Sequence, residues 1–572
     1  MKKFFVFLLT VFIILGCSMN LSADSKVPVV EKKMPYTKGL NLTQWLEPFG
    51  AGNSSSTRYG KTDFENIKSL GVEIVRVPVH FENWSSGAPD YVIEDWLWKI
   101  LDNAVEWCTE LKMYIIIDFH NDCNGNSRTK PDVEKMLMKV WPQIAERYKN
   151  SGEYVIYEIM NEPHMKSGNL NADVDKWGKI QGRVLKTIRS IDSKHTVIVG
   201  AEDWNSVHQL LKLPDYEDDN LIYNFHDYSP FLFSHQGAGW THLKRLTKIP
   251  FPYVKSKMPS LPKDANDAER NEYNNYEKNS SEKVLVEPLN KAVDFANKRH
   301  VALMCNEYGV MMDYADNQER TNWYRMKANW MEERNIIRVS WDYNGSFGIF
   351  NRADGEFPED VNTVLVEGMG FKAPSKKNAG NKPNWYDSAV KRGSFEIYKD
   401  GFAENVIVGG WVNTQGKKLS FSNKDSDGGP MYIGIPKADA YNTVEFDFKK
   451  PCNLTKLIEN DMSLELEIKT LQKDLRLNVY FRNPDKPEKG DSGYPWRCGE
   501  FIRSKQVPSD GMWHKIKIPL KSLQDYGAWS NAENKWISSK KMFDWKQVRY
   551  LVLDFAEIPV TKDIMIRNIE IK

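Results

Sequence analysis

Two glutamates follow apolar runs of the sequence, and a pair of carboxylic acids can perform acid–base and nucleophilic chemistry. Glu162 stands in YEIMNEPH, residues 157–164, between an amide and a rigid proline. Glu307 stands in MCNEYGV, residues 304–310. One carboxylic acid can protonate a leaving oxygen while the other attacks the anomeric carbon or activates water. The pair therefore predicts hydrolysis of a glycosidic bond, provided that the fold brings both acids to one place.

Polar and amphipathic residues stand near the ends of six apolar runs, including the two that precede the glutamates. Besides the two glutamates they are Arg76, His120, Asn161, His226, Tyr228 and Trp341. In a barrel of parallel strands, the carboxyl ends of the strands form the face that carries the active site. We expect Arg76 and the phenol of Tyr228 to hold Glu307 ionised, and His226 to hydrogen-bond Glu162 and tune it as an acid/base.

Eight short apolar runs alternate with stretches of helical periodicity. The runs lie at 39–42, 73–79, 113–119, 154–160, 195–200, 220–225, 301–305 and 336–341. Parallel strands need crossover helices and are buried on both faces, so this pattern predicts a (β/α)8 TIM barrel over residues 37–370. A doubly wound open sheet is the alternative. The long connection between residues 226 and 281 is expected to form a wall or lid of the site.

The ordered set of motifs resembles the catalytic set of glycoside hydrolase family 5. It consists of VEIVRVPVHF, IIIDFHND, Asn161-Glu162-Pro163, His226-Asp227-Tyr228, MCNEYGV and RVSWDYNG. The resemblance covers roughly residues 38–370 and implies a retaining mechanism, with Glu162 as acid/base and Glu307 as nucleophile. Two departures concern the substrate: Phe81 stands where many relatives have tryptophan, and the loop after His226 is long.

The leading substrate prediction is β-1,4-glucan, because PFLFSHQGAGW, residues 230–240, resembles a loop of endoglucanases in that family. Mannanase and xyloglucanase activities are alternatives, since enzymes of both kinds share the same catalytic residues. The same resemblance implies endo action, on cellulose or mixed-linkage glucan. Asn161 is expected to donate to the sugar 2-hydroxyl. Trp45, Trp204 and Trp240 are candidate platforms on which sugar rings stack.

The periodicity changes from helical to alternating after residues 371–386, a stretch rich in Lys, Pro and Asn that predicts a linker. Residues 387–572 are predicted to form an all-β sandwich of the jelly-roll type. The pattern is similar to that of carbohydrate-binding modules, with Tyr494, Trp496 and Trp529 as candidate glycan contacts. A domain that only stiffens the barrel is the alternative.

The N-terminus has the pattern of a bacterial lipoprotein. Lys2 and Lys3 precede the apolar run 4–15, which predicts a signal peptide over residues 1–16. The segment Ile14-Leu15-Gly16-Cys17 resembles a lipobox, and the resemblance implies lipid attachment at Cys17. Residues 17–36 are expected to be a tether, with the protein at the cell surface or periplasmic face. Plain secretion or a retained anchor is the alternative.

Composition excludes several other classes of function. Lys and Arg total 78 against 77 Asp and Glu, so there is no surplus of positive charge for binding nucleic acid. The remaining cysteines are scattered, and no spacing typical of a metal site or a serine-hydrolase elbow occurs. We therefore expect no metal and no cofactor. A lipid-anchored glycan-binding protein without catalysis is the rival of another class, but it would lack one carboxylate, and both are present.

Overall fold

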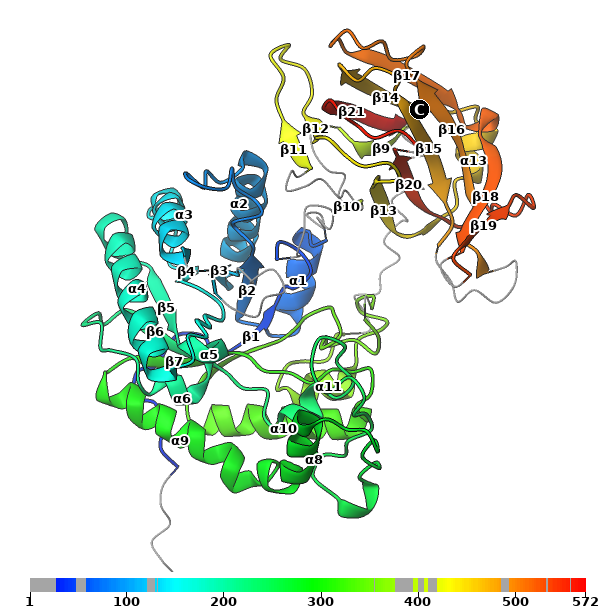
Figure 1. Ribbon diagram of the computed structural model, residues 1–572. Coiled ribbons are helices and arrows are strands. Elements are labelled where there is room, and N and C mark those ends of the chain that lie inside the picture. Colours follow the sequence, from blue (N-terminus) through cyan, green and yellow to red (C-terminus); the bar gives the residue numbers. More distant parts are fainter. Residues whose placement is uncertain are drawn as a thin grey trace, which may run out of the picture.

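The computed structural model describes most of two consecutive domains. The described residues are 27–47, 58–120, 129–130, 132–353, 355–375, 394–399, 406–409, 419–484, 493–530, 533–555 and 557–572. Figure 1 shows a helix-covered barrel followed along the chain by a β-sandwich. The predicted signal peptide, the lipidation site Cys17 and residues 376–386 of the predicted linker lie outside the described residues.

Eight parallel strands close into a barrel in the order of the sequence, which confirms the predicted TIM barrel. The strands are β1 Lys38–Asn41, β2 Ile74–Val79, β3 Tyr114–Phe119, β4 Val155–Glu158, β5 Thr196–Gly200, β6 Leu221–His226, β7 Ala302–Glu307 and β8 Ile337–Ser340. β1 pairs with both β2 and β8, so the sheet is closed. This closure excludes the doubly wound alternative.

Helices cover the outside of the barrel and bury the outer faces of its strands. They include α1 Lys61–Ser69, α2 Asp95–Glu110, α3 Val133–Tyr148, α4 Leu170–Ile191, α5 Glu202–Asn205, α6 Val207–Leu210, α9 Glu282–Lys298, α10 Asn317–Glu333 and α11 Thr363–Gly368. The long insertion after β6 carries α7 Phe231–Ser234 and α8 Asp267–Asn279. α8 was not predicted because it is almost entirely polar; the capping box of Asn266 and Glu269 marks its start.

The barrel interior is apolar in the half nearer the amino ends of the strands. Alternate residues of each strand point to the barrel axis, so a period of two selects the inner layer. This layer consists mainly of Ile74, Ile116, Ile156, Ile198, Ile222 and Met304. Tyr36, which is 1% exposed, packs against it. Residues 27–36 therefore differ from the predicted tether: they lie on the barrel, where the backbone N–H of Val30 donates to the carbonyl of Arg334 at 2.9 Å.

A charged layer lies two residues further along the strands, around the buried guanidinium of Arg76. Its Nε and Nη2 donate to the two oxygens of Glu158 at 2.7 and 2.9 Å, and Nη2 is 2.9 Å from Asp118. Burial raises the pKa of Asp118 to about 7 and also raises the pKa of Glu158. Burial opposes the charge of Arg76, but the surrounding carboxylates outweigh it and hold its pKa well above its ordinary value.

The C-terminal domain consists of two antiparallel sheets, as predicted for a β-sandwich. The seven-stranded sheet has the order β10 Ile407–Gly409, β13 Thr443–Cys452, β20 Val548–Asp554, β15 Arg476–Arg482, β16 Arg497–Arg503, β18 Gln524–Ser530, β19 Lys535–Ser538. The six-stranded sheet comprises β11 Ser420–Asn423, β12 Tyr432–Ile435, β21 Ile564–Ile571, β14 Ser463–Thr470 and β17 His514–Pro519, with β9 Phe395–Tyr398 paired to β21. Trp96 of α2 meets Phe421 of β11 edge to face at 5.7 Å, which joins the domains.

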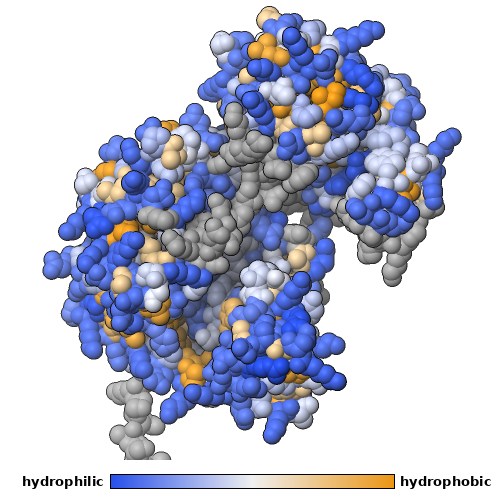
Figure 2. Space-filling view, in the orientation of Figure 1, coloured by the Kyte–Doolittle hydropathy of each residue, from blue (hydrophilic) through white to orange (hydrophobic). Residues whose placement is uncertain are grey.

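The face of the molecule seen in Figure 2 is mainly hydrophilic. Figure 2 shows hydrophobic residues scattered over the visible face rather than gathered in one patch. Among the residues that the structure describes, no helix is both long and apolar enough to cross a membrane.

Replacing the buried guanidinium should destabilise the barrel strongly. Arg76→Met leaves Glu158 and Asp118 buried without their cation, so we expect the free energy of unfolding of the barrel to fall by about 3–5 kcal/mol. Arg76→Lys should recover only part of this loss, because an ammonium cannot bind a carboxylate through two parallel hydrogen bonds. Denaturant titration followed by tryptophan fluorescence measures both variants.

Arg183 provides the matched control, because it pairs with Glu134 on the surface, where its side chain is 52% exposed. Arg183→Met should change the free energy of unfolding by less than about 1 kcal/mol. Equal destabilisation by the surface and the buried substitutions would contradict the role of Arg76 as the centre of the charged layer.

Candidate active site

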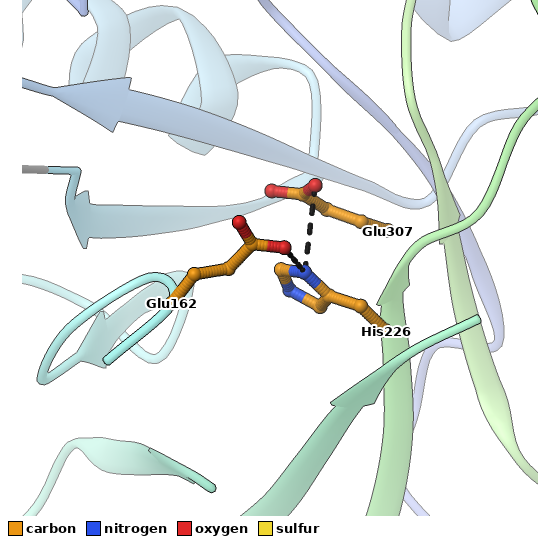
Figure 3. Close-up of side chains that lie close together, drawn as sticks. All are labelled: Glu162, His226 and Glu307. Atoms are coloured by element: carbon orange, nitrogen blue, oxygen red, sulfur yellow. Dashed lines mark hydrogen bonds and ion pairs between the residues drawn. The ribbon is translucent and has the colours of Figure 1, made fainter. Parts of the chain in front are cut away.

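The predicted residues meet at the carboxyl ends of the strands, directly above the charged layer. Glu162 follows β4, His226 ends β6 and Glu307 ends β7. Figure 3 shows these three side chains pointing toward one another from three separate segments. One nitrogen of His226 and one oxygen of each glutamate lie within 4.8 Å of one another. This spacing would also suit a metal ion, but the side chains already hydrogen-bond to one another and to their neighbours.

Glu307 lies in a buried pocket of hydrogen-bond donors. Its side chain is 6% exposed and accepts from Arg76 Nη1 at 2.7 Å and from the hydroxyl of Tyr228 at 2.9 Å. Burial, reinforced by the charge of Glu307, raises the pKa of Tyr228 well above its ordinary value, so the phenol keeps its proton. These donors hold both carboxyl oxygens of Glu307 in place. The expected contacts of Arg76 and Tyr228 with Glu307 are present.

A β-bulge aims Glu307 into the barrel. Strict alternation would point Asn306 inward and Glu307 outward. The β6–β7 register shifts after Phe225, so that His226 pairs with Glu307. Asn306 still faces inward, where its Nδ2 donates to Glu158 at 2.8 Å. The irregularity therefore places two consecutive side chains in the interior, as bulges near active sites often do.

Glu162 has a more open environment than Glu307. Its side chain is 26% exposed, and its Oε1 lies 2.6 Å from Nδ1 of His226. Burial lowers the pKa of His226 to about 4, although Glu307 opposes this shift. The imidazole is consequently neutral near pH 7 and binds Glu162 by a hydrogen bond without cancelling a charge. The predicted contact between His226 and Glu162 is present.

Asn161, His120 and Trp341 form one continuous wall of the site. Asn161 Oδ1 accepts from Arg76 Nη2 at 2.7 Å, which turns its amide nitrogen toward Nε2 of His120 at 3.3 Å. Nδ1 of His120 lies 2.7 Å from Asp118, and burial lowers the pKa of His120. The ring of Trp341 stacks on His120 with centroids 5.7 Å apart. Hydrogen bonds thus connect the wall to the charged layer below.

The three tryptophans predicted to stack on sugar rings have different fates. Trp45 is 1% exposed and packs edge-on against Tyr59, so its prediction as a platform is wrong. Trp204 is 40% exposed, and its ring stacks on His164 at 4.7 Å. Trp240 in the insertion is 66% exposed. Trp240 and part of Trp204 are therefore accessible to a ligand.

The insertion after β6 forms a side of the site, as expected for the long loop. Ala238 of the insertion clusters with Met311 and Phe347, and Tyr228 and Trp341 pack against this cluster. The apolar contacts hold the Tyr228 phenol and the Trp341 indole in place.

Several residues of the site were not predicted. Asp118 and Glu158 each stand two residues after an inward-facing isoleucine, Ile116 and Ile156. The alternation of inward-facing residues along the strands was therefore the signal that could have identified them. The two strands without a predicted residue also contribute. Asn41 ends β1 and accepts from Arg76 at 3.0 Å, and Asn205 follows β5 and approaches His226. All eight strands therefore supply or support the site.

The aromatic residues predicted for the sandwich are only partly available. Trp496 is 3% exposed and packs edge-on against Tyr494 at 5.8 Å, so it is wrong as a stacking platform. The hydroxyl of Tyr494 bonds to Glu533. Trp529 is 38% exposed and lies opposite Trp536 in the β18–β19 pair.

The chain is similar to known glycoside hydrolases. A family model described as cellulase, glycosyl hydrolase family 5, matches residues 32–347. Endoglucanase 3 of Fibrobacter succinogenes is 29% identical over 365 residues, 60% of this chain and 54% of that protein. Endoglucanase C of Acetivibrio thermocellus is 29% identical over 350 residues, 58% of this chain and 98% of that protein.

Among solved structures, endoglucanase Cel5A from Thermotoga maritima is 26% identical and has a TM-score of 0.47, with 58% of this chain and 96% of that chain covered. The chain thus spans about half the length of Endoglucanase 3 and nearly all of Endoglucanase C. Because the family model matches more than half of the chain and contains both glutamates, this protein belongs to glycoside hydrolase family 5.

Proposed function

We propose that the protein is a retaining, endo-acting glycoside hydrolase that cleaves β-1,4-glucan by double displacement. The observation that carries this proposal is the short distance between the two acids, since an oxygen of Glu162 and one of Glu307 lie within 4.8 Å. Retaining pairs stand about 5–5.5 Å apart, whereas inverting pairs leave room for a water at about 6.5–9.5 Å. The names of the relatives support the choice of an endoglucanase.

Each acid has one role in each step. Glu307 attacks the anomeric carbon, and hydrogen bonds from Arg76 and Tyr228 hold it in position. Glu162 gives a proton to the leaving oxygen in the same step. In the second step Glu162 takes a proton from a water molecule whose oxygen attacks the anomeric carbon, and the bond between the sugar and Glu307 breaks. Asn161 is proposed to donate to the 2-hydroxyl as the transition state forms.

The proposed substrate is a β-linked polysaccharide. Cellulose and mixed-linkage glucan are the leading polymers, and mannan and xyloglucan are the alternatives. Ala238 of the insertion lies in the cluster against which Tyr228 and Trp341 pack, and Trp240 contacts His235 of the same insertion, so the insertion is proposed to sense differences between these polymers. Activity on a panel of polysaccharides ranks them directly.

Amide substitution should separate the roles of the acids. Glu307→Gln should abolish turnover, because an amide cannot attack the anomeric carbon. Glu162→Gln should lower kcat/KM on polysaccharide by about 10²–10⁴-fold, the usual contribution of a general acid. With a dinitrophenyl glycoside, whose leaving group needs no proton, Glu162→Gln should still release the phenol in a first burst. Stopped-flow absorbance measures this burst.

Product stereochemistry provides an independent check of the mechanism. Proton NMR of the first product from a β-glucan should show the β-anomer. Initial appearance of the α-anomer, or equal losses of Glu162→Gln on activated and unactivated substrates, would contradict double displacement with these roles.

We further propose that the sandwich binds glycan on the outer face of its seven-stranded sheet. Tyr480 is 2% exposed but lies outside the apolar core that contains its neighbours Val479 and Phe481, so it faces away from the second sheet. The ring of Tyr526 stacks on that of Trp536 with centroids 6.0 Å apart, and Trp536 is 43% exposed. This face offers flat aromatic surfaces to a ligand.

Buried polar groups with unused hydrogen-bonding capacity accompany these rings. Oδ1 of Asn478, Oδ1 of Asp554 and Nε of Arg497 are buried and have no hydrogen-bond partner in the described part of the chain. Asn478 and Asp554 lie opposite each other in the β15–β20 pair. On the six-stranded sheet, by contrast, Glu465 and Glu467 form ion pairs with lysine and arginine side chains. A sugar ring has a flat face that can stack on these aromatic rings, and hydroxyl groups that can hydrogen-bond to these polar groups.

Removing the exposed indole should weaken binding to polymer. In full-length protein carrying Glu307→Gln, Trp536→Ala should reduce affinity for soluble β-glucan at least about tenfold. This is the loss expected when an aromatic side chain that the bound ligand covers is removed. Native electrophoresis in gels containing the polymer measures the affinity. Tyr441→Ala, which removes a 62% exposed ring outside the sheets, should migrate like its parent. Equal retardation of all three proteins would contradict the proposed face.

Attachment through lipid at Cys17 is the proposed mode of localisation, based on the Ile14-Leu15-Gly16-Cys17 segment. A single acyl chain binds membranes only marginally, so firm attachment requires several. Wild-type protein should therefore sediment with membranes, and Cys17→Ser should shift most of it to the soluble fraction. Wild-type protein found entirely in the medium would contradict the proposal.

A further inference from the structure

Asn205 lies between the backbone that precedes Glu162 and the ring of His226. Its Oδ1 accepts from the N–H of Ala201 at 2.6 Å, and its Nδ2 donates to the carbonyl of Asn161 at 2.6 Å. The same Nδ2 lies 3.3 Å from Nε2 of His226. Its side chain is fully buried, so these three contacts define its environment.

The contacts determine which nitrogen of His226 carries the proton. A backbone N–H can only donate and a carbonyl can only accept, so the amide of Asn205 has one allowed orientation. Its second N–H therefore points at Nε2 of His226, which must accept. The proton of the neutral ring is then on Nδ1, which lies 2.6 Å from Oε1 of Glu162.

The backbone at Asn205 has an uncommon conformation that accompanies its contact with His226. Asp203, Trp204 and Asn205 have φ values of 60°, 54° and 57°, three consecutive left-handed residues of which none is glycine. A Cβ at Gly200 would collide with Oδ1 of Asn205. Unfavourable backbone of this kind persists only where the surroundings impose it, and it clusters at functional sites. Both features place the Asn205 amide against His226.

We propose that Asn205 is a positioning residue that holds His226 as the Nδ1–H tautomer and so determines which oxygen of Glu162 carries the catalytic proton. Oε1 accepts from His226, so the acid proton resides on Oε2 and passes from there to the leaving oxygen. In the other tautomer, the lone pair of Nδ1 would face Oε1 and compete for that proton. This inference rests on the proposed double displacement.

Charged groups other than Glu162 also surround the ring of His226, so its tautomer affects both acids of the site. Besides Glu162, the ring of His226 is influenced by Glu307, Arg76 and Glu158, and by the nearby side chain of Asn306. Nδ1 is 3.5 Å from Oε2 of Glu307, so the same N–H lies between the two acids. Loss of this N–H would leave a lone pair facing two carboxyl groups.

The test compares substrates that differ only in their need for a proton. Asn205→Gly removes the amide but tolerates positive φ, and Asn205→Asp tolerates it while presenting an acceptor to Nε2. The substrates are the phenyl and 2,4-dinitrophenyl glycosides of the disaccharide that the wild-type enzyme releases from its best polysaccharide. We expect kcat/KM of Asn205→Gly to fall at least about tenfold on the phenyl glycoside and less than about twofold on the dinitrophenyl glycoside. Asn205→Asp should show a larger loss on the phenyl glycoside.

Two further variants separate this role from a structural one. Asp203→Gly changes the same left-handed segment without touching His226, and both substrates should react as in the wild type. Gly200→Ala displaces the Asn205 amide without removing it, and should reproduce the selective loss if Asn205→Gly does not fold. Equal losses on both glycosides in folded variants would overturn the inference. Failure of the wild-type enzyme on both glycosides and all polysaccharides would instead overturn the proposed function.

Discussion

The guanidinium of Arg76 is the interaction on which the barrel interior depends. It is fully buried and binds Glu158, Asp118 and Glu307, so one cation serves three buried carboxyl groups. Buried charges are tolerated only when they are paired and hydrogen-bonded. The positions of β2, β3, β4 and β7 are thereby linked through a single side chain, and the site above inherits this rigidity.

The two acids of the site differ because their surroundings differ. Glu307 is nearly enclosed by the donors Arg76 and Tyr228, each of which binds one of its oxygens. Glu162 is 26% exposed and contacts a neutral imidazole, so it can exchange a proton with substrate and solvent. Different environments for two chemically identical groups are the usual way in which a protein assigns an acid and a nucleophile. The β-bulge in β7 and the loop after β5 are the local irregularities that create this difference.

The sandwich adds a second surface without altering the first. Its seven-stranded sheet has its own aromatic face. The described contacts with the barrel include the ring pair of Trp96 and Phe421, on the other sheet, and the ion pair of Glu356 with Lys450 of β13. A binding surface tethered to a catalytic domain raises the local concentration of polymer, and leaves the chemistry unchanged. The proposed glycan face and the barrel would therefore act on one polymer through independent contacts.

Much of this protein followed from local patterns in the sequence. The eight strands, the sandwich and the placing of Glu162 and Glu307 at strand ends depend on apolar periodicity, which is a property of neighbouring residues. The tertiary structure decided which side chains share an interior. Asp118 and Glu158 became part of the site only because closure of the barrel turned them toward Arg76. Trp45 and Trp496 are buried rather than exposed, and Asn205 reaches His226 through a left-handed turn. A local pattern shows that a face will be buried or polar, but its partner is determined by contacts between segments far apart in the chain.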